Sequence, residues 1–176
     1  MPSCPRLLAL VLAPLLLHAC TQEPEPHEYD PDAVLAEALE FETKFERLDA
    51  QPKASVHGNM DGYAEFYANE IAAEVFRGID GSDPNATAKF PRGSILVKNN
   101  LGPDMQPLGM LTIMAKFEEG YYRQGNDWFW AMVTTDGEPV MDRIGNGQKI
   151  YFCYDCHSQM GSNTDFVIGL APDELR

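Results

Sequence analysis

The sequence predicts an α+β fold, an antiparallel β-sheet with flanking N-terminal helices. Apolar residues recur at helical spacing before Phe90, and after it the chain turns to short β-branched and aromatic runs separated by glycine-containing turns. The connections between these runs are short, which favours antiparallel pairing because parallel strands need long crossovers. A chain of 176 residues is long enough for one domain with its own core.

Residues 1–19 have the composition of an export signal. The apolar stretch from Leu7 to Leu17 is shorter than the ~20 residues that span a bilayer. It ends in Leu17-His18-Ala19-Cys20, where a small residue precedes a cysteine as in a bacterial lipoprotein signal. We therefore predict lipidation of Cys20 and a location on the periplasmic side of a bacterial membrane. The alternative is an ordinary secretory signal that is cleaved nearby.

Two helices are expected after an acidic, proline-rich tether at residues 20–31, within a domain at residues 32–176. The first runs from Asp32 to Ala50, with Asp32 as its N-cap. The second runs from about Asp61 to Phe76 and ends at the turn of residues 78–81. The apolar positions behind these predictions are Val34, Ala38, Phe41, Phe45 and Leu48 in the first helix, and Tyr67, Ala68, Ile71, Ala72 and Val75 in the second.

Three strands are predicted, at residues 94–99, 110–118 and 128–135, each bounded by turn residues. Strand alternation places Lys98 on the same face as Leu96. On the second strand, alternation places Met110, Thr112, Met114 and Lys116 on one face. On the third strand, it places Trp128, Trp130 and Met132 on one face. The tryptophans are interpreted as sheet core.

Residues 153–157, Cys-Tyr-Asp-Cys-His, form a C-x-x-C-H motif, the attachment site of a c-type haem. Two thiols two residues apart can add across the vinyl groups on one edge of the porphyrin, and the next histidine supplies the proximal nitrogen to iron. We expect one covalent haem c on Cys153 and Cys156, with His157 as the metal ligand. A zinc site would need two more ligands, and a thioredoxin-like C-x-x-C would lie early, between a strand and a helix.

Cysteine count and charge limit the partners. Cys4 leaves with the predicted signal, so no disulfide is expected once Cys20 carries lipid and the motif carries haem. The formal net charge of −14 argues against nucleic acid and against a basic patch on anionic lipid. Membrane association is therefore expected only through the lipid. The charge permits a basic redox partner protein.

The late position of His157 excludes the commonest cytochrome design, in which the motif lies near the N-terminus and a methionine ligand follows far downstream. Met160 is too close to His157 to reach the opposite face of the haem. A sixth iron ligand would have to come from upstream, and each candidate is individually expected to be core or surface. These candidates are Met110, Met114, Met132, Met141, Lys98 and His57.

The chain from about Met60 to Val167 resembles the cytochrome P-460 and cytochrome c′-beta family. The resemblance rests on residues 90–98 (FPRGSILVK), 111–116 (LTIMAK), 125–130 (GNDWFW) and the closing stretch 145–157. It implies an antiparallel sheet with flanking helices, usually in a homodimer, and a five-coordinate haem iron. Cytochrome P-460 members oxidise hydroxylamine and carry a lysine bonded to the porphyrin, whereas cytochrome c′-beta members bind nitric oxide and carbon monoxide without such turnover.

Lys98 matches the cross-linking lysine of that pattern. Desolvation on the sheet would lower its pKa and leave a nucleophilic amine, and the alternative is a solvated lysine at a strand end. The carboxylate that accepts substrate protons in hydroxylamine-oxidising members is matched near Thr112, whose hydroxyl cannot serve as a base at neutral pH. Asp127, Glu118 and Glu119 would substitute only if a loop folded over the haem.

The sequence thus predicts an exported monohaem cytochrome that binds or converts small nitrogen compounds, nitric oxide or hydroxylamine, at an open distal haem site. Lys98 and Thr112 are the candidate catalytic residues of a hydroxylamine-oxidising oxidoreductase of the cytochrome P-460 type. The alternatives are a six-coordinate electron-transfer cytochrome and a gas-binding protein without turnover.

Overall fold

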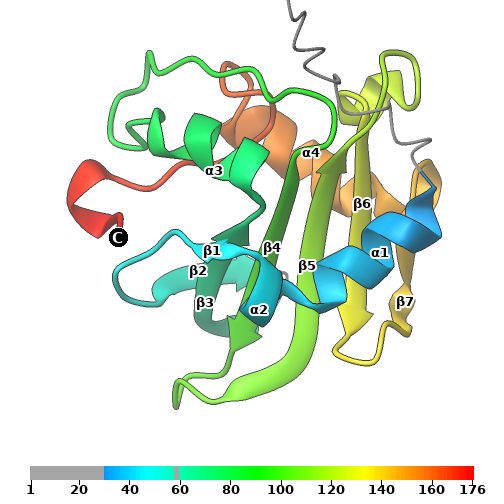
Figure 1. Cartoon of the computed structure of the whole chain (residues 1–176), viewed down its shortest axis with the longest axis horizontal. Coiled ribbons are helices and arrows are strands. Elements are labelled where there is room, and N and C mark those ends of the chain that lie inside the picture. The colour runs from blue at the N-terminus through cyan, green and yellow to red at the C-terminus, as the bar shows by residue number, and fades with distance from the viewer. Residues whose placement is uncertain (1–29, 58–59) are drawn as a thin grey trace, which may run out of the picture.

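The computed structural model describes residues 30–57 and 60–176, and these form an α+β fold around an open antiparallel sheet of seven strands (Figure 1). This confirms the predicted fold class. The helices are α1 (Pro31–Leu39), α2 (Phe41–Lys44), α3 (Glu70–Arg77) and α4 (Tyr151–Met160), with short 3-10 turns η1 (Arg123–Gly125), η2 (Gln148–Ile150) and η3 (Pro172–Glu174). The strands are β1 (Glu46–Arg47), β2 (Lys53–His57), β3 (Met60–Ala68), β4 (Ile95–Leu101), β5 (Pro107–Lys116), β6 (Trp128–Thr134) and β7 (Pro139–Gly145).

The strand order is β1-β3-β4-β5-β6-β7, and β2 also pairs with β3. All three predicted strands are confirmed as β4, β5 and β6, the centre of the sheet. Their register aligns Phe66 with Lys98, Lys98 with Thr112, and Thr112 with Met132. A row of side chains from four adjacent strands therefore crosses one face of the sheet.

The sheet separates two apolar cores because successive side chains of each strand point to opposite faces. One face packs under α1 and α2 (Figure 1), and its buried residues include Ile113 and Ala131. The other packs against α3, α4 and the C-terminal segment. Trp128 and Trp130 are buried in this second core, as predicted for sheet-core tryptophans.

The first predicted helix, Asp32 to Ala50, is shorter and broken. Helix α1 begins at Pro31, the last residue of the predicted tether, and the N-cap is Asp30 rather than Asp32. The chain leaves helical geometry at Glu40, forms the short α2, and then enters β1. The five apolar positions behind the prediction are nevertheless all buried. The helical spacing therefore located the core correctly but not the end of the helix.

The second predicted helix, Asp61 to Phe76, is half wrong, since its first part is the strand β3. Ala64 and Ala68 are fully buried, whereas Glu65 and Tyr67 point to the opposite face, which is the period of two expected for a strand. This segment pairs with β2 on one side and β4 on the other. Helix α3 begins only after Asn69 and ends at Arg77, with Gly78, the first residue of the predicted turn, as its C-cap. Its buried residues are Ala72, Ala73 and Phe76, whereas Ile71 is exposed.

The C-terminal segment closes the fold beside the β1–β2 connection. The backbone N–H of Ala50 donates to Glu174, and that of Arg176 donates to Leu48, both at 2.8 Å. Lys53 forms an ion pair with Glu174. These contacts bring the end of the chain against the start of β2.

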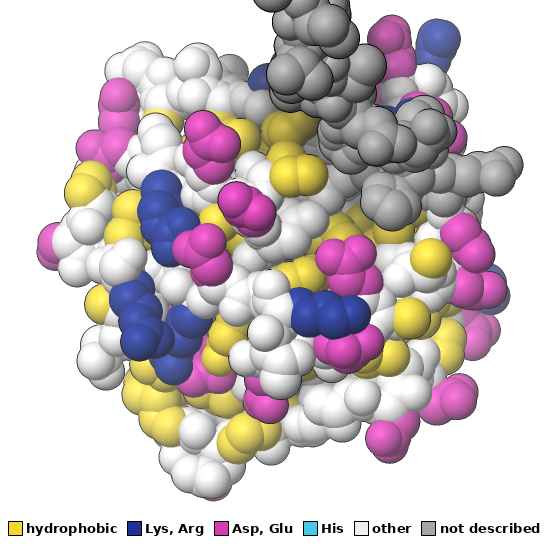
Figure 2. Space-filling view, viewed as in Figure 1, with side chains coloured by type: hydrophobic (Ala, Val, Ile, Leu, Met, Phe, Trp, Pro, Cys, Tyr) yellow, Lys and Arg dark blue, Asp and Glu magenta, His cyan; other side chains and the backbone are white. Residues whose placement is uncertain are grey.

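Acidic side chains are spread over the face seen in Figure 2 rather than gathered in one patch, and several lie beside Lys or Arg. No helix within residues 30–57 and 60–176 is long and apolar enough to cross a membrane.

Candidate functional site

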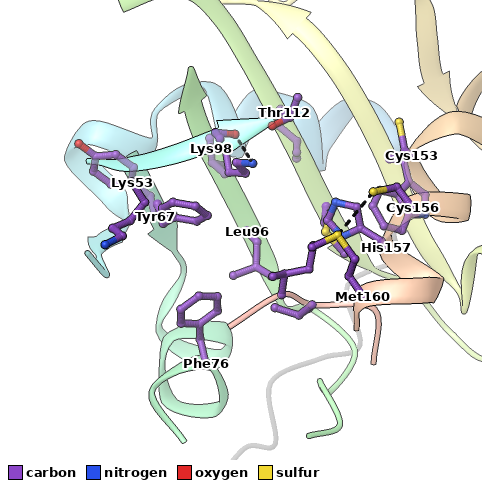
Figure 3. A pocket seen from close by; sticks show the side chains of 18 of the residues that line it. Lys53, Tyr67, Phe76, Leu96, Lys98, Thr112, Cys153, Cys156, His157 and Met160 are labelled. Atoms are coloured by element: carbon purple, nitrogen blue, oxygen red, sulfur yellow. Dashed lines mark hydrogen bonds between the residues drawn. The ribbon is translucent and has the colours of Figure 1, made fainter. Parts of the chain in front are cut away.

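Helix α4 carries both cysteines and the histidine of the C-x-x-C-H motif. Cys153 lies three residues before Cys156 and four before His157, so these side chains share one side of the helix. All three line a cavity of about 810 Å³ that extends from α4 across the sheet (Figure 3). Both cysteines are free thiols. Burial raises the pKa of the Cys153 thiol above its ordinary value, and the nearby charge of Arg143 opposes this rise.

His157 is held in one orientation. Its Nδ1 lies 2.8 Å from the backbone carbonyl oxygen of Phe166, and its ring packs edge-on against Trp130 with the ring centroids 4.9 Å apart. Burial lowers the pKa of His157 to about 4, so the ring is neutral at pH 7. A neutral ring that donates from Nδ1 presents the lone pair of Nε2, the form in which histidine binds a metal.

The cavity is mostly apolar, and its volume lies in the range of pockets that hold cofactors. Figure 3 shows the two cysteines and His157 at one end and Lys53 at the other. Strands β4, β5 and β6 form one wall, with Leu96, Lys98, Thr112, Met114, Trp130 and Met132. Leu48, Phe76, Val167 and Leu170 are among the other apolar residues that line the cavity.

Lys98 lies on the cavity wall together with Leu96, as strand alternation predicted. Its Nζ donates to Ser55 Oγ at 2.8 Å and lies 5.3 Å from the centroid of the Phe66 ring. Burial lowers the pKa of Lys98 to about 8, so roughly a tenth of the amine is neutral at pH 7. The side chain therefore occupies the apolar surroundings that the cross-link hypothesis requires.

Thr112 faces the same cavity and is the cross-strand neighbour of Lys98. Its Oγ1 is buried and has no hydrogen-bond partner within the described part of the chain. A buried hydroxyl without a partner is uncommon and costs stability. The hydroxyl can therefore serve a bound molecule as donor or acceptor.

The acidic residues considered as substitutes for a distal base are not at the cavity. Asp127 Oδ1 accepts a hydrogen bond from the backbone N–H of Tyr122 at 2.9 Å. Glu118 and Glu119 are exposed beyond the end of β5. None of these three carboxylates lines the cavity.

The candidate sixth ligands separate into two groups. Met114, Met132 and Lys98 line the cavity, whereas Met110 is buried without lining it and Met141 is exposed on β7. The side chain of His57 lies outside the described part of the structure. Met160 lines the cavity beside the motif, with its Sδ 3.7 Å from Cys156 Sγ.

Sequence reasoning missed two cations of the cavity. Arg143 on β7 donates to Met132 Sδ at 3.7 Å and lies over the Phe152 ring, 5.1 Å from its centroid. Lys53 and its partner Glu174 line the other end. Strand β7 was not predicted because proline, glycine and charged residues interrupt its alternation. The position of Lys53 was not predicted because its ion pair with Glu174 joins segments that are far apart in the chain.

Cys153, Cys156 and His157 are the described residues that could hold a covalent haem at the cavity. Within residues 30–57 and 60–176, no three His, Cys, Asp or Glu side chains gather as they would around a metal ion. Two thiols, one neutral imidazole, an apolar cavity and an unsatisfied hydroxyl at its wall are what a porphyrin with a small bound ligand would need.

Cys20, the predicted lipidation site, lies outside the described residues. No family model matches the chain, and a search of curated proteins finds no significant match. The resemblance to the cytochrome P-460 and cytochrome c′-beta family therefore remains an expectation based on the sequence segments named above.

Proposed function

We propose that this chain is an exported monohaem c-type cytochrome whose haem c is bound covalently through Cys153 and Cys156, with His157 as the iron ligand. One observation carries the proposal: the three motif residues border a mostly apolar cavity of about 810 Å³, and the Phe166 carbonyl fixes the His157 proton on Nδ1. This arrangement leaves Nε2 as the nitrogen for the metal.

Charged side chains at the cavity suit the polar groups of a haem. Porphyrin propionates lie on the edge opposite the vinyl groups, so they need cations away from the cysteines. Lys53 lies at that end of the cavity (Figure 3) and is the residue that would hold a propionate, in exchange for Glu174. The Leu96, Met114 and Trp130 side chains would pack against the ring.

The substrate or ligand class that fits is a small nitrogen compound, nitric oxide or hydroxylamine. Haem iron supplies the site at which such molecules bind and exchange electrons. The chain supplies two polar groups at the wall, the Lys98 amine and the Thr112 hydroxyl, among apolar and sulfur-containing neighbours. Such a site has room for a small neutral molecule and offers it hydrogen bonds.

Lys98 is the proposed site of a cross-link to the porphyrin edge, in which its Nζ replaces a hydrogen on a ring carbon, two protons leave to solvent and two electrons pass to an added oxidant such as hydrogen peroxide. A lysine with its pKa lowered to about 8 holds enough neutral amine to act as a nucleophile. Thr112 provides no base, however, so the proposal is binding with slow or absent hydroxylamine oxidation. Mass spectrometry of the haem peptide decides the cross-link: an adduct joining the Lys98 peptide to haem is expected, and its absence would exclude the bond.

A second function, an electron-transfer cytochrome, is favoured by Met114 and Met132, since both place sulfur at the cavity. The ferrous optical spectrum separates the two. A high-spin spectrum that shifts on addition of carbon monoxide supports the open site, and a low-spin spectrum that Met114→Leu or Met132→Leu abolishes supports the electron carrier. A gas-binding protein without turnover would show the first spectrum and no hydroxylamine oxidation.

Haem attachment is tested by Cys153→Ala/Cys156→Ala in the exported chain. The double variant should show no haem stain on a denaturing gel, because no thioether can form. Asp155→Asn is the matched control, since it alters the same turn of α4 while leaving both thiols and His157 in place. Haem that survives the double change, or is lost equally from the control, would refute the proposal.

The remaining features of the proposal follow from sequence. The chain would be lipid-anchored at Cys20 on the periplasmic side of a bacterial membrane. The family resemblance implies a homodimer, and the acidic charge of −14 suits a basic redox partner protein and disfavours nucleic acid.

A further inference from the structure

Asp165, a buried residue on the segment that follows α4, is held through both its carboxylate and its backbone carbonyl. Lys116 Nζ lies 2.6 Å from its Oδ1, and the side-chain amide of Asn126 donates to the same oxygen. The backbone N–H of Phe90 donates to Oδ2 at 2.8 Å. The carbonyl oxygen of Asp165 accepts a hydrogen bond from Trp128 Nε1, also at 2.8 Å. Every oxygen of the residue is thus engaged.

Lys116 is fixed as firmly as its partner. It is 8% exposed and Asp165 is 7% exposed. Its Nζ also donates to the backbone carbonyl of Asn126 at 2.7 Å and lies 5.0 Å from the centroid of the Trp128 ring. Removing one member of such a pair leaves a buried charge or donor unsatisfied. The pair therefore ties residue 165 to the ends of β5 and β6.

The tie has a consequence for the backbone. Asp165 and Phe166 both have left-handed conformations, with φ of 58° and 69°. This region is uncommon for non-glycine residues other than Asn and Asp, so a bulky residue such as Phe166 needs its surroundings to hold it there. The backbone N–H of Phe166 donates to Gly161 at 2.8 Å. With both residues held this way, the Phe166 carbonyl oxygen lies 2.8 Å from His157 Nδ1.

We propose that Asp165 is a positioning residue for His157: the buried Lys116–Asp165 pair imposes the backbone conformation that brings the Phe166 carbonyl to Nδ1. This rests on the proposed function in one respect, that His157 is the haem ligand. Asp165 itself does not line the cavity. It acts through Phe166, and the resulting hydrogen bond selects the ring tautomer and strengthens Nε2 as a donor to iron.

The direct test is the tautomer of His157 in Asp165→Asn, measured by two-bond ¹H–¹⁵N NMR on the full chain without haem, with the signal assigned from His157→Gln. The asparagine side chain is neutral, so Lys116 loses its charged partner. The asparagine NH₂ group would also face the Phe90 N–H or the Asn126 amide, which are themselves donors. The wild-type ring should be almost entirely the Nδ1–H form. In the variant the Nε2–H form should rise by about tenfold, the factor for loss of one well-made hydrogen bond.

Asp49→Asn is the matched control. Asp49 is also buried, with Arg47 Nη2 2.9 Å from its Oδ2 and the Phe66 backbone N–H donating to its Oδ1 at 2.7 Å, but it does not lie on the segment that holds Phe166. If Asp165→Asn fails to fold, Asn126→Gly removes one contact to the carboxylate at a residue whose φ of 53° suits glycine. An unchanged tautomer in the folded variant, or an equal change in Asp49→Asn, would overturn the inference.

The haem-loaded protein gives a second readout. Weakening the Nδ1–H hydrogen bond makes the imidazole a poorer electron donor, so the reduction potential of Asp165→Asn should move upward relative to Asp49→Asn. The two proposals fail separately. A chain that never binds haem refutes the cytochrome while the tautomer ratio still tests Asp165. If the protein binds haem but Asp165→Asn changes neither the His157 tautomer ratio nor the reduction potential, only the positioning role is refuted.

Discussion

At the scale of single residues, the distinctive pair is Lys98 and Thr112, polar neighbours across β4 and β5 on a mostly apolar cavity wall. Each lies where a polar group is costly: the amine loses hydration, and the hydroxyl lacks a partner within the described residues. A protein that only needed a stable core would gain by replacing them with apolar residues. Their presence at the cavity therefore supports a role toward a bound molecule.

Lys98 gives a pH-dependent prediction for the haem-free chain. Its pKa is about 8 in the folded chain against an ordinary value of 10.5 when unfolded, because burial disfavours the charged amine. Between these values the unfolded chain binds more protons, so this residue makes the free energy of unfolding rise with pH. The difference in that free energy between wild type and Lys98→Met should change by about 3 kcal/mol from pH 7 to pH 11. Denaturant titrations of both proteins measure it, and parallel pH profiles would contradict it.

Thr112 gives a prediction about turnover. Thr112→Glu places a carboxylate beside Lys98, where it can accept protons from hydroxylamine, and a general base is worth about 10²-fold or more in rate. A steady-state assay with an artificial electron acceptor should show this gain over a slow parent. Thr112→Val is the control, because it keeps the shape and adds no base. Rapid hydroxylamine oxidation by the parent would show that the proton acceptor lies elsewhere.

At the scale of elements, the junction of β3 and α3 decides where a helix-like sequence becomes a strand. Asn69 Oδ1 accepts hydrogen bonds from the backbone N–H groups of Ala72 and Ile95, at 3.1 and 3.0 Å. Its Nδ2 donates to the Gly93 carbonyl at 2.7 Å. One side chain thus caps α3 and joins it to the start of β4.

Asn69→Ala should lower the free energy of unfolding by about 3 kcal/mol, because it removes a helix cap and two further, partly buried hydrogen bonds. Thermal and denaturant unfolding of the full chain measure the loss. Asp30→Ala provides the comparison, since Asp30 caps α1 at an exposed position through one hydrogen bond to Asp32 and should cost about 1 kcal/mol. Equal losses in the two variants would mean that Asn69 does no more than cap its helix.

At the scale of the whole molecule, one sheet serves two purposes because its faces alternate. The face under α1 and α2 is filled by side chains, and the other holds the cavity between the sheet, α4 and the C-terminal segment. Cores of this kind are closely packed, so a large opening on one side indicates a function rather than loose packing. The filled face supports the sheet that carries Lys98 and Thr112.

The predicted anchor is tested on the whole chain. Cys20→Ser should move the protein from the membrane fraction to the soluble periplasmic fraction without changing its optical spectrum, because lipid is its only expected contact with the membrane. Cys4→Ser, within the predicted signal, should leave the protein in the membrane fraction. Fractionation followed by blotting compares the two. Retention of Cys20→Ser in the membrane would refute the lipoprotein prediction.

Sequence alone determined the features that depend on neighbours in the chain. Spacing alone identified Cys153, Cys156 and His157 as a motif, and alternation places Lys98 and Leu96 on one face of a strand. The helix α4 that carries the motif was not predicted. The tertiary structure decided what depends on distant segments. Residues 61–68 form a strand because partners exist on both sides. The hydrogen bond between the Phe166 carbonyl and His157 depends on the backbone conformation of residues 165 and 166. Asp165 is bound by groups that lie 37 to 75 residues away in the chain, and no local sequence pattern encodes such contacts.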